Sequence, residues 1–173
     1  MTMTATPTTT GEIEAFRHQA RVIDAVVRLN VAGVTHQESL TQPSPGGNCL
    51  NWVLGHLVAT QENALRLLGQ ETVFPAGALK RYDRAGDPIR GDAPDVRNFS
   101  DLLAAWETSA PRLDAGLAAL DPATFDQPAP FSPTNDPNET VRTLVVTILF
   151  HQAYHAGQAG VLRRISGKAG AIK

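Results

Sequence analysis

The sequence predicts an all-α fold, a four-helix bundle with a long crossover between its second and third helices. Three observations support this fold class. Four segments repeat apolar residues at steps of three and four positions, the spacing that puts them on one face of a helix. No segment alternates apolar and polar residues over a sustained length, as a half-buried strand does. The connection between the second and third segments is long and rich in proline, glycine and aspartate.

The first predicted helix runs from about Glu12 to His36, and its recurring apolar residues are Ile13, Phe16, Ala20, Ile23, Val27 and Val34. The second runs from about Cys49 to Leu68. Asn48 is its expected cap, because an asparagine side chain accepts a hydrogen bond from a free backbone N–H. Gly69 is its expected stop, since glycine adopts the left-handed conformation that ends many helices.

The third predicted helix spans about Asp101 to Leu120, with Ser100 as its expected cap. Its inward-facing residues are expected to be Leu102, Leu103, Trp106, Leu113, Leu117 and Leu120. Pro111 lies inside this helix. We expect it to kink or locally break the helix, because proline lacks the backbone donor.

Residues 69–100 separate the second helix from the third, whereas about two to eight residues usually join helices in a bundle. This length favours an overhand crossover or a lid over a tight turn. A second irregular connection, residues 121–138, contains five prolines and leads to the fourth helix.

The fourth predicted helix runs from about Val141 to Ser166, with Thr140 as its cap and Gly167 as its stop. Its apolar face carries residues at steps of four, three, four, three and four: Leu144, Ile148, His151, His155, Gln158 and Leu162. Two histidines therefore stand where a bundle core would usually have leucines.

Composition and length predict one domain over residues 1–173, with a disordered, threonine-rich N-terminus of about residues 1–10. Hydrophobic residues make up 42% and charged residues 18%, a balance typical of globular proteins that bury a core. The net charge is −2 and no basic block is present, which argues against nucleic acid as a partner.

The chain is expected to be soluble and cytoplasmic, without a membrane partner. Its longest strongly apolar run, residues 144–150, is too short to span a bilayer, and the N-terminus lacks the features of a signal peptide. Cys49 is the single cysteine, so no internal disulfide can form and a reducing compartment is the natural interpretation.

Three of the five histidines stand out as candidate metal ligands. His151 and His155 are four residues apart, so both rings can reach one ion from one helix face. His56 lies on a second, mostly apolar helix. Buried imidazoles need partners, because an unpaired buried polar group costs about 1–3 kcal/mol, and a shared metal would satisfy all three. For His18 and His36, which have polar neighbours, a surface position is the better interpretation.

Simpler interpretations of these histidines exist. A histidine pair at this spacing is often bonded only to water or to other side chains. The third histidine favours a metal, and three nitrogen ligands leave positions open as in catalytic rather than structural sites. Classical zinc-protease chemistry is disfavoured, because Gln152 stands where the protease motif has its glutamate.

Two sequence strings resemble those of the DinB-like superfamily. The first, of the form NxLxWxxGHL, covers residues 48–57, and the second, HxxYHxGQ, covers residues 151–158. The resemblance implies a four-helix bundle whose second and fourth helices lie side by side. It also implies a metal site formed by His56, His151 and His155, with zinc or nickel as the usual metal. Homodimers are common in that family.

The resemblance implies activity less specifically than it implies fold. Members include proteins described as metal-dependent hydrolases and as S-transferases that use a low-molecular-weight thiol as co-substrate. The sequence contains no thiol-binding signature that selects among them. A metal-dependent enzyme acting on a small molecule is therefore one hypothesis. The alternative is a non-catalytic bundle that binds a metal or small ligand as a sensor or sequestering protein, which the lack of an obvious acid/base carboxylate near the histidines favours mildly.

Catalytic residues stay unassigned, but several side chains are candidates for supporting roles. Gln158 and Asn63 could orient water or substrate, although a polar position near the bundle end is the slightly favoured interpretation of each. Trp52 and Tyr154 are expected to be packing or pocket walls. A pair of arginines, Arg163 and Arg164, could hold a substrate carboxylate, but a basic helix end favoured by the helix dipole is the simpler explanation. Cys49 is expected to be a small buried residue rather than a nucleophile.

Overall fold

The computed structural model describes residues 9–84 and 86–172. Its helices are α1 (Thr9–Val31), α2 (His36–Ser39), α3 (Leu50–Leu67), η1 (Lys80–Tyr82), α4 (Phe99–Ala118), η2 (Pro122–Thr124) and α5 (Val141–Ile165). In these ranges the only β-type pairing is one isolated bridge, between Pro128 and Thr140. The predicted all-α class is confirmed. The expected disordered tail falls mostly outside the described residues, although α1 already includes Thr9 and Thr10.

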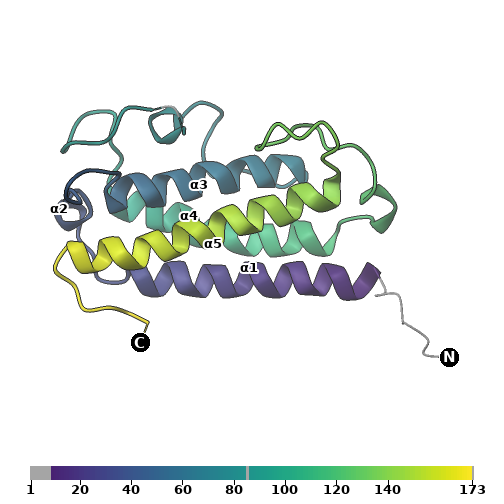
Figure 1. Ribbon diagram of the computed structural model, residues 1–173, viewed down its shortest axis with the longest axis horizontal. Coiled ribbons are helices and arrows are strands. Elements are labelled where there is room, and N and C mark those ends of the chain that lie inside the picture. The colour runs from purple at the N-terminus through teal and green to yellow at the C-terminus, as the bar shows by residue number, and fades with distance from the viewer. Residues whose placement is uncertain (1–8, 85, 173) are drawn as a thin grey trace.

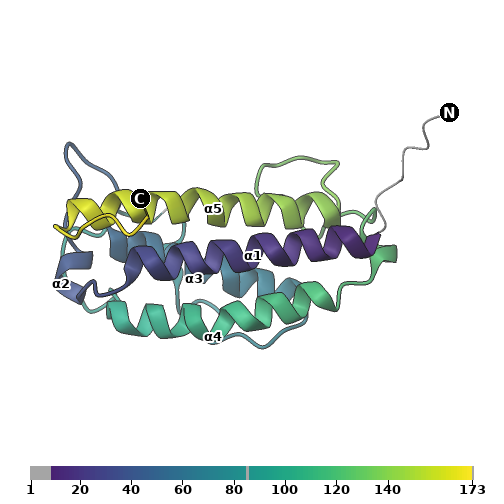
Figure 2. The ribbon, with the colours of Figure 1, turned by 90° about the horizontal axis from the view of Figure 1, so that it is seen from below.

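The four long helices form a bundle in which α1 and α5 run in one direction and α3 and α4 in the other (Figures 1 and 2). Each helix packs on two neighbours: α1 on α4 and α5, and α3 on the same two helices. Because α3 and α4 are parallel neighbours, the chain between them must return along the whole bundle, as Figure 1 shows. The predicted crossover is confirmed, and so is the predicted packing of the second and fourth long helices, α3 and α5, side by side.

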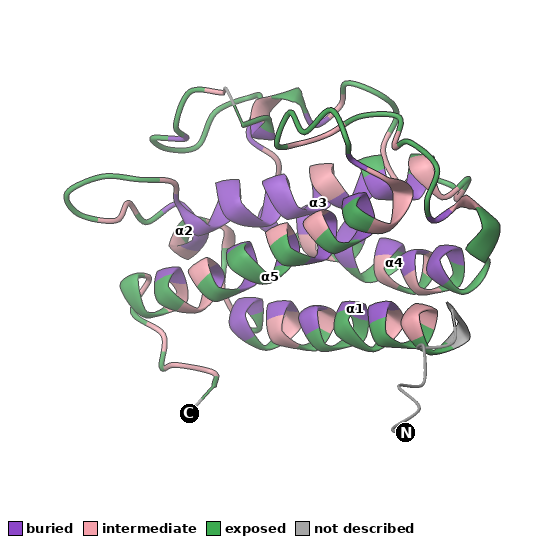
Figure 3. Ribbon diagram, turned by 45° about the vertical axis from the view of Figure 1, so that its right-hand side comes forward, coloured by how far each residue is buried: buried purple, intermediate pink, exposed green. Residues whose placement is uncertain are grey.

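The core lies between the four helices, and α3 is its most deeply buried member (Figure 3). Every residue from 50 to 58 is buried, because α4 and α5 cover two sides of α3 and the crossover covers a third. Burying a large apolar side chain contributes about 1.5–3 kcal/mol to the free energy of unfolding. The packing of residues 50–58 therefore strongly stabilises the first half of α3. The candidate site lies on this well-packed part of the bundle.

The first predicted helix is two helices, and its single span to His36 was wrong. The helix α1 ends at Val31, and Gly33 follows with a φ of 69°, a left-handed conformation that suits glycine. The short α2 then starts its own capping box, in which the Thr35 hydroxyl accepts from the Glu38 N–H and the Glu38 carboxylate accepts from the Thr35 N–H. Both stop signals at Gly69 and Gly167 are confirmed, with φ of 65° and 88°.

Two of the predicted caps were wrong by one or two residues. Helix α3 begins one residue later than Asn48 would require, with Cys49 at the N-cap position and no side-chain cap. Helix α4 is capped by Asn98, whose side-chain oxygen accepts from the N–H of Ser100. Ser100 therefore belongs to the first turn, since asparagine two residues earlier already satisfies the free donor.

Pro111 does not break α4, which continues from Phe99 to Ala118. Proline removes one hydrogen bond, the one that would reach the carbonyl of Glu107. Both residues are exposed, so water can satisfy that carbonyl and the cost of the missing donor is small.

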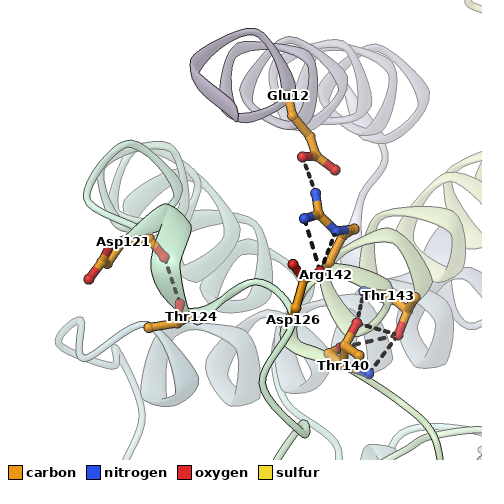
Figure 4. A network of polar contacts seen from close by, with 7 residues as sticks. All are labelled: Glu12, Asp121, Thr124, Asp126, Thr140, Arg142 and Thr143. Atoms are coloured by element: carbon orange, nitrogen blue, oxygen red, sulfur yellow. Dashed lines mark hydrogen bonds and ion pairs between the residues drawn. The ribbon is translucent and has the colours of Figure 1, made fainter. Parts of the chain in front are cut away.

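The start of α5 is joined to α1 and to the preceding connection by polar contacts (Figure 4). Thr140 caps α5 as predicted, through a reciprocal capping box with Thr143. The guanidinium of Arg142 pairs with Glu12 on α1 and with Asp126, whose oxygen lies 3.1 Å away. These contacts hold the proline-rich second connection against the bundle end.

The crossover is fastened to α3 by a buried carboxylate. Glu62 is almost fully buried, and its carboxylate accepts the backbone N–H groups of Val73 and Phe74 at 3.0–3.1 Å. Farther along the crossover, the Tyr82 hydroxyl donates to Asn51 on α3 and accepts from the N–H of Arg97. The crossover therefore has a defined path over α3. Among the described helices, none is both long and apolar enough to cross a membrane.

Candidate metal centre

Three histidines from two helices meet in the middle of the α3–α5 interface. His56 comes from α3, and His151 and His155 come from successive turns of α5. One ring nitrogen from each lies within 4.8 Å of the others, and the His56 and His151 Nε2 atoms are 3.0 Å apart. The structure thus brings together the three residues that the sequence singled out. His56 and His155 are buried and His151 is half-buried.

His56 is oriented by the crossover. Its Nδ1 lies 2.7 Å from the backbone carbonyl of Tyr82, which can only accept, so Nδ1 carries the hydrogen. The neutral ring then presents an unprotonated Nε2 to the cluster. Gly55 permits this contact, because a Cβ there would lie 2.1 Å from the Tyr82 ring. The Trp52 indole stacks on the imidazole, with ring centroids 4.6 Å apart.

His155 is oriented by its own helix. Its Nδ1 lies 2.7 Å from Oε1 of Gln158, one turn further along α5. The Nδ1–H donates to this oxygen, which leaves Nε2 of His155 unprotonated as well. Such an outer hydrogen bond is typical of metal-ligating histidines, because it fixes the tautomer and the ring orientation.

His151 completes the cluster without a comparable partner. Its Nδ1 is buried and makes no hydrogen bond among the described residues. Its Nε2 faces Nε2 of His56, and two lone pairs 3.0 Å apart repel each other unless a proton or a cation lies between them. Three converging imidazole nitrogens, two with their tautomers fixed from behind, are a donor set that fits a divalent transition metal.

The surroundings keep all three rings neutral. Burial is the main cause that lowers the pKa of each ring. The pKa of His151 falls to about 4, because repulsion from His155 and His56 adds to the effect of burial. The pKa of His56 and of His155 is also lowered by burial, opposed by the hydrogen bonds to Tyr82 and Gln158 respectively. Neutral imidazole is the form that binds a metal, so the cluster is ready to do so near neutral pH.

Two cavities adjoin the histidine cluster. The first, of about 290 Å³, is lined by His56, His151 and the apolar side chains of Phe131, Ile148, Phe150 and Tyr154. The second, of about 550 Å³, contains His155, Gln158 and Trp52 in its lining. Tyr154 and Arg84 line both cavities. A small molecule can therefore approach the cluster from either side.

The residues with predicted supporting roles fall into two groups. Gln158 contacts His155 directly, and Tyr154 and Trp52 form cavity walls as expected. Asn63 is exposed at the edge of the first cavity, where its side-chain oxygen accepts from Arg66. Among the hydrogen bonds of the described residues, none joins Asn63 to any of the three histidines.

The two arginines at the end of α5 do not serve the cluster. Arg163 donates to the carbonyls of Ala32 and Ala169, which is the structural role favoured for a basic helix end. Arg164 lines a separate groove at the C-terminal tail. Cys49 is fully buried, and burial raises the pKa of its thiol, so it is the small core residue that was expected.

The remaining histidines differ from each other. His18 is exposed, as expected. His36 is half-buried, and its Nδ1 accepts the backbone N–H of Phe99 at 3.2 Å at the start of α4. The expectation of a simple surface position was wrong for His36, because the crossover returns the chain to α2 before α4 begins.

Sequence reasoning missed Tyr82 and Arg84, the crossover residues nearest to the cluster. Neither belongs to a periodic segment, so their contacts with the site depend on the path of the crossover. The nearest signal was Gly55 in the middle of a buried helix, since a glycine there indicates close approach of another segment.

Comparison with known protein families supports the same assignment. The family model described as the DinB superfamily matches residues 17–159, which include all three histidines and the four long helices except the ends of α1 and α5. A comparison with curated proteins gave no match. The bundle with its crossover, the two sequence strings and this match agree, and the chain belongs to the DinB superfamily.

Proposed function

We propose that this protein is a metal-dependent enzyme in which His56, His151 and His155 hold one divalent ion, zinc or nickel. The observation that carries the proposal is the convergence of three neutral imidazoles within 4.8 Å, with two of them in the wall of a cavity. Such an ion would supply Lewis acidity, because it lowers the pKa of a bound water or thiol and polarises an electrophile.

The chain's own residues would position the reactants. Tyr82 and Gln158 hold the rings of His56 and His155 from behind, so the ligand nitrogens keep their direction. The apolar side chains of the first cavity would give an apolar part of a bound molecule a contact surface beside His56 and His151. We propose a small-molecule hydrolase or thiol-dependent S-transferase, with the thiol as co-substrate in the second case.

A steady-state screen tests the proposal. The full chain is loaded with zinc or nickel and assayed for ester and amide hydrolysis and for thiol transfer to small electrophiles, in parallel with metal-depleted protein and a His151→Gln variant. We expect turnover from the loaded wild type alone. Equal rates from the metal-depleted protein would contradict a metal-dependent enzyme.

One observation favours the alternative, a non-catalytic metal- or ligand-binding protein. No aspartate or glutamate is among the described residues that line the two cavities beside the cluster, so an obvious general acid or base is missing. This alternative predicts stoichiometric metal binding without turnover in any of the assays.

We also propose that two copies of the chain associate. Support comes from the outer face of α5, where large apolar side chains are exposed, among them Val146, Phe150 and Val161. Light scattering is expected to give twice the mass of one chain. The mass of a single chain at micromolar concentration would contradict this assembly.

A further inference from the structure

The cavities beside the histidine cluster have one charged side chain in common. Arg84, on the crossover just after η1, lines both the first and the second cavity. No other lysine, arginine, aspartate or glutamate is among the described residues that line either of them. The guanidinium therefore faces space that a ligand of the histidine cluster would occupy.

Among the described residues, Arg84 has no carboxylate partner. Arg17, Arg28 and Arg142 form ion pairs with aspartate or glutamate at the bundle surface. Within residues 9–84 and 86–172, the single hydrogen bond of Arg84 is a long contact of 3.4 Å to the backbone carbonyl of Pro133. Its donors are thus largely available to an incoming anion.

The Pro133 contact also places Arg84 above the first cavity. Pro133 belongs to the second connection, and both Pro133 and Phe131 line the first cavity. The two irregular connections therefore meet over the space in front of His56 and His151. The same cavity is also lined by apolar side chains, among them Phe131, Ile148 and Phe150, and by the uncharged polar side chains of Thr60, Asn63, Thr134 and Thr147.

The charge balance of the site calls for an anion. The three histidines are neutral, so a bound divalent ion would add two positive charges to that of Arg84, and the described lining residues supply no negative charge. Arg84 is exposed, so water solvates its guanidinium in the free protein, but positive charge beside both cavities attracts an anionic ligand and repels a cationic one. Guanidinium groups match the planar carboxylate best, through two parallel hydrogen bonds.

We infer that the site takes a small organic acid, whose carboxylate pairs with Arg84 and whose apolar body lies in the first cavity beside His56 and His151. The cavity volume of about 290 Å³ suits a molecule of the size of a substituted aromatic or branched aliphatic acid. This inference deepens the function proposed above and rests on it for the reaction, whereas the pairing with Arg84 needs no metal.

Binding of matched probes tests the inference on the full chain, both metal-depleted and zinc-loaded. The acid is para-fluorobenzoate and the neutral control is para-fluorobenzamide, each titrated by fluorine NMR. Arg84→Gln removes the charge and Arg84→Lys keeps it without the planar fork. Arg90→Gln, an exposed arginine of the same crossover that lines neither cavity, is the control variant.

We expect wild type and Arg90→Gln to bind the acid more tightly than the amide in both metal states. Arg84→Gln is expected to bind the acid about tenfold more weakly, the effect of losing one charge-assisted contact, and to bind the amide as wild type does. The affinity of Arg84→Lys for the acid should lie between those of wild type and Arg84→Gln.

Three results would overturn the inference. One is an Arg84→Gln variant that binds the acid as tightly as wild type does in metal-depleted protein. A second is acid binding that appears only after zinc loading and is equal in both proteins, which would assign the anion to the metal and leave the proposed metal function standing. The third is inorganic phosphate that competes as well as the acid, since the apolar walls would then contribute nothing. If zinc fails to bind at all, the proposed function fails, while the metal-depleted titration still decides the role of Arg84.

Discussion

The orientation of His56 depends on a glycine next to it in the chain. Gly55 lets the crossover approach α3 so closely that the Tyr82 carbonyl reaches Nδ1 of His56 at 2.7 Å. This hydrogen bond to Nδ1 fixes the tautomer of His56, so that its unprotonated Nε2 faces the cluster. At the residue scale, the site therefore depends as much on the absence of a side chain at position 55 as on the histidines.

A Gly55→Ala substitution tests this dependence. The new Cβ would lie 2.1 Å from Cδ1 of Tyr82, so the Tyr82 ring and its carbonyl have to move. We expect a loss of about 1–3 kcal/mol in the free energy of unfolding, as for other overpacked cores. Denaturant unfolding measures it.

The matched control is Gly157→Ala on α5, where a Cβ meets no atom within 4 Å. That change is expected to stabilise the helix by about 0.5–1 kcal/mol. A Gly55→Ala protein as stable as wild type would show that the crossover does not rest on position 55.

The lowered pKa values of the three histidines predict how stability depends on pH. In metal-free protein the pKa of His151 falls from the usual 6.5 to about 4, and those of His56 and His155 are lowered too. Between pH 6.5 and about 4 the unfolded chain therefore binds more protons than the folded chain. The free energy of unfolding is expected to fall as the pH is lowered through this range.

Denaturant unfolding of metal-free protein at a series of pH values measures this dependence. In a His151→Leu variant the slope should be shallower, because one of the three groups no longer titrates. A wild-type stability that stays constant across the range, or rises towards acid, would be inconsistent with neutral buried histidines.

At the scale of the helices, a buried amide network holds α3, α4 and α5 in register next to the cluster. The Gln152 amide on α5 donates to the Gln61 side-chain oxygen on α3 at 3.1 Å, and Gln61 in turn donates to the Ser109 hydroxyl on α4. All three residues are buried. Because His151 directly precedes Gln152, this network also holds the α5 turn that carries the ligand.

A double-mutant cycle on Gln61 and Gln152 measures the strength of this link. Gln152→Leu alone leaves the Gln61 oxygen buried without a donor, and we expect a cost of about 1–3 kcal/mol. The double variant with Gln61→Leu removes both partners of that bond, so its cost should be smaller than the sum of the two single changes. Strictly additive costs, measured by denaturant unfolding, would mean that the two amides do not cooperate.

The helices could be predicted from the sequence, but their ends less so. Periodic apolar residues place all four long helices correctly, because burial of one face is the main source of helix stability in a bundle. The ends depend on single contacts. Gly33 ends α1 early, and Asn98 takes the capping role expected of Ser100. Pro111 stays inside α4 because its lost hydrogen bond lies at the exposed surface.

At the scale of the whole molecule, the crossover completes the candidate site, because it adds contacts that the four long helices alone do not provide. It makes α3 and α4 parallel, covers the third side of α3, and brings Tyr82 and Arg84 to the histidines (Figure 1). The three histidines themselves could be predicted, because their spacing on apolar helix faces is visible in the sequence. The crossover contacts could not, since an irregular segment has no periodic signal and its path is set by distant partners such as Glu62.

The most direct test of the metal centre is the metal content of the full chain purified without an affinity tag. Elemental analysis of wild type is expected to find about one zinc or nickel per chain, as one three-histidine site requires. A His155→Ala variant should lose most of it, whereas a variant of the exposed His18 should keep it. Wild type that contains no metal and takes up neither zinc, nickel nor manganese would contradict the account, and the three histidines would then be polar residues of a helical core.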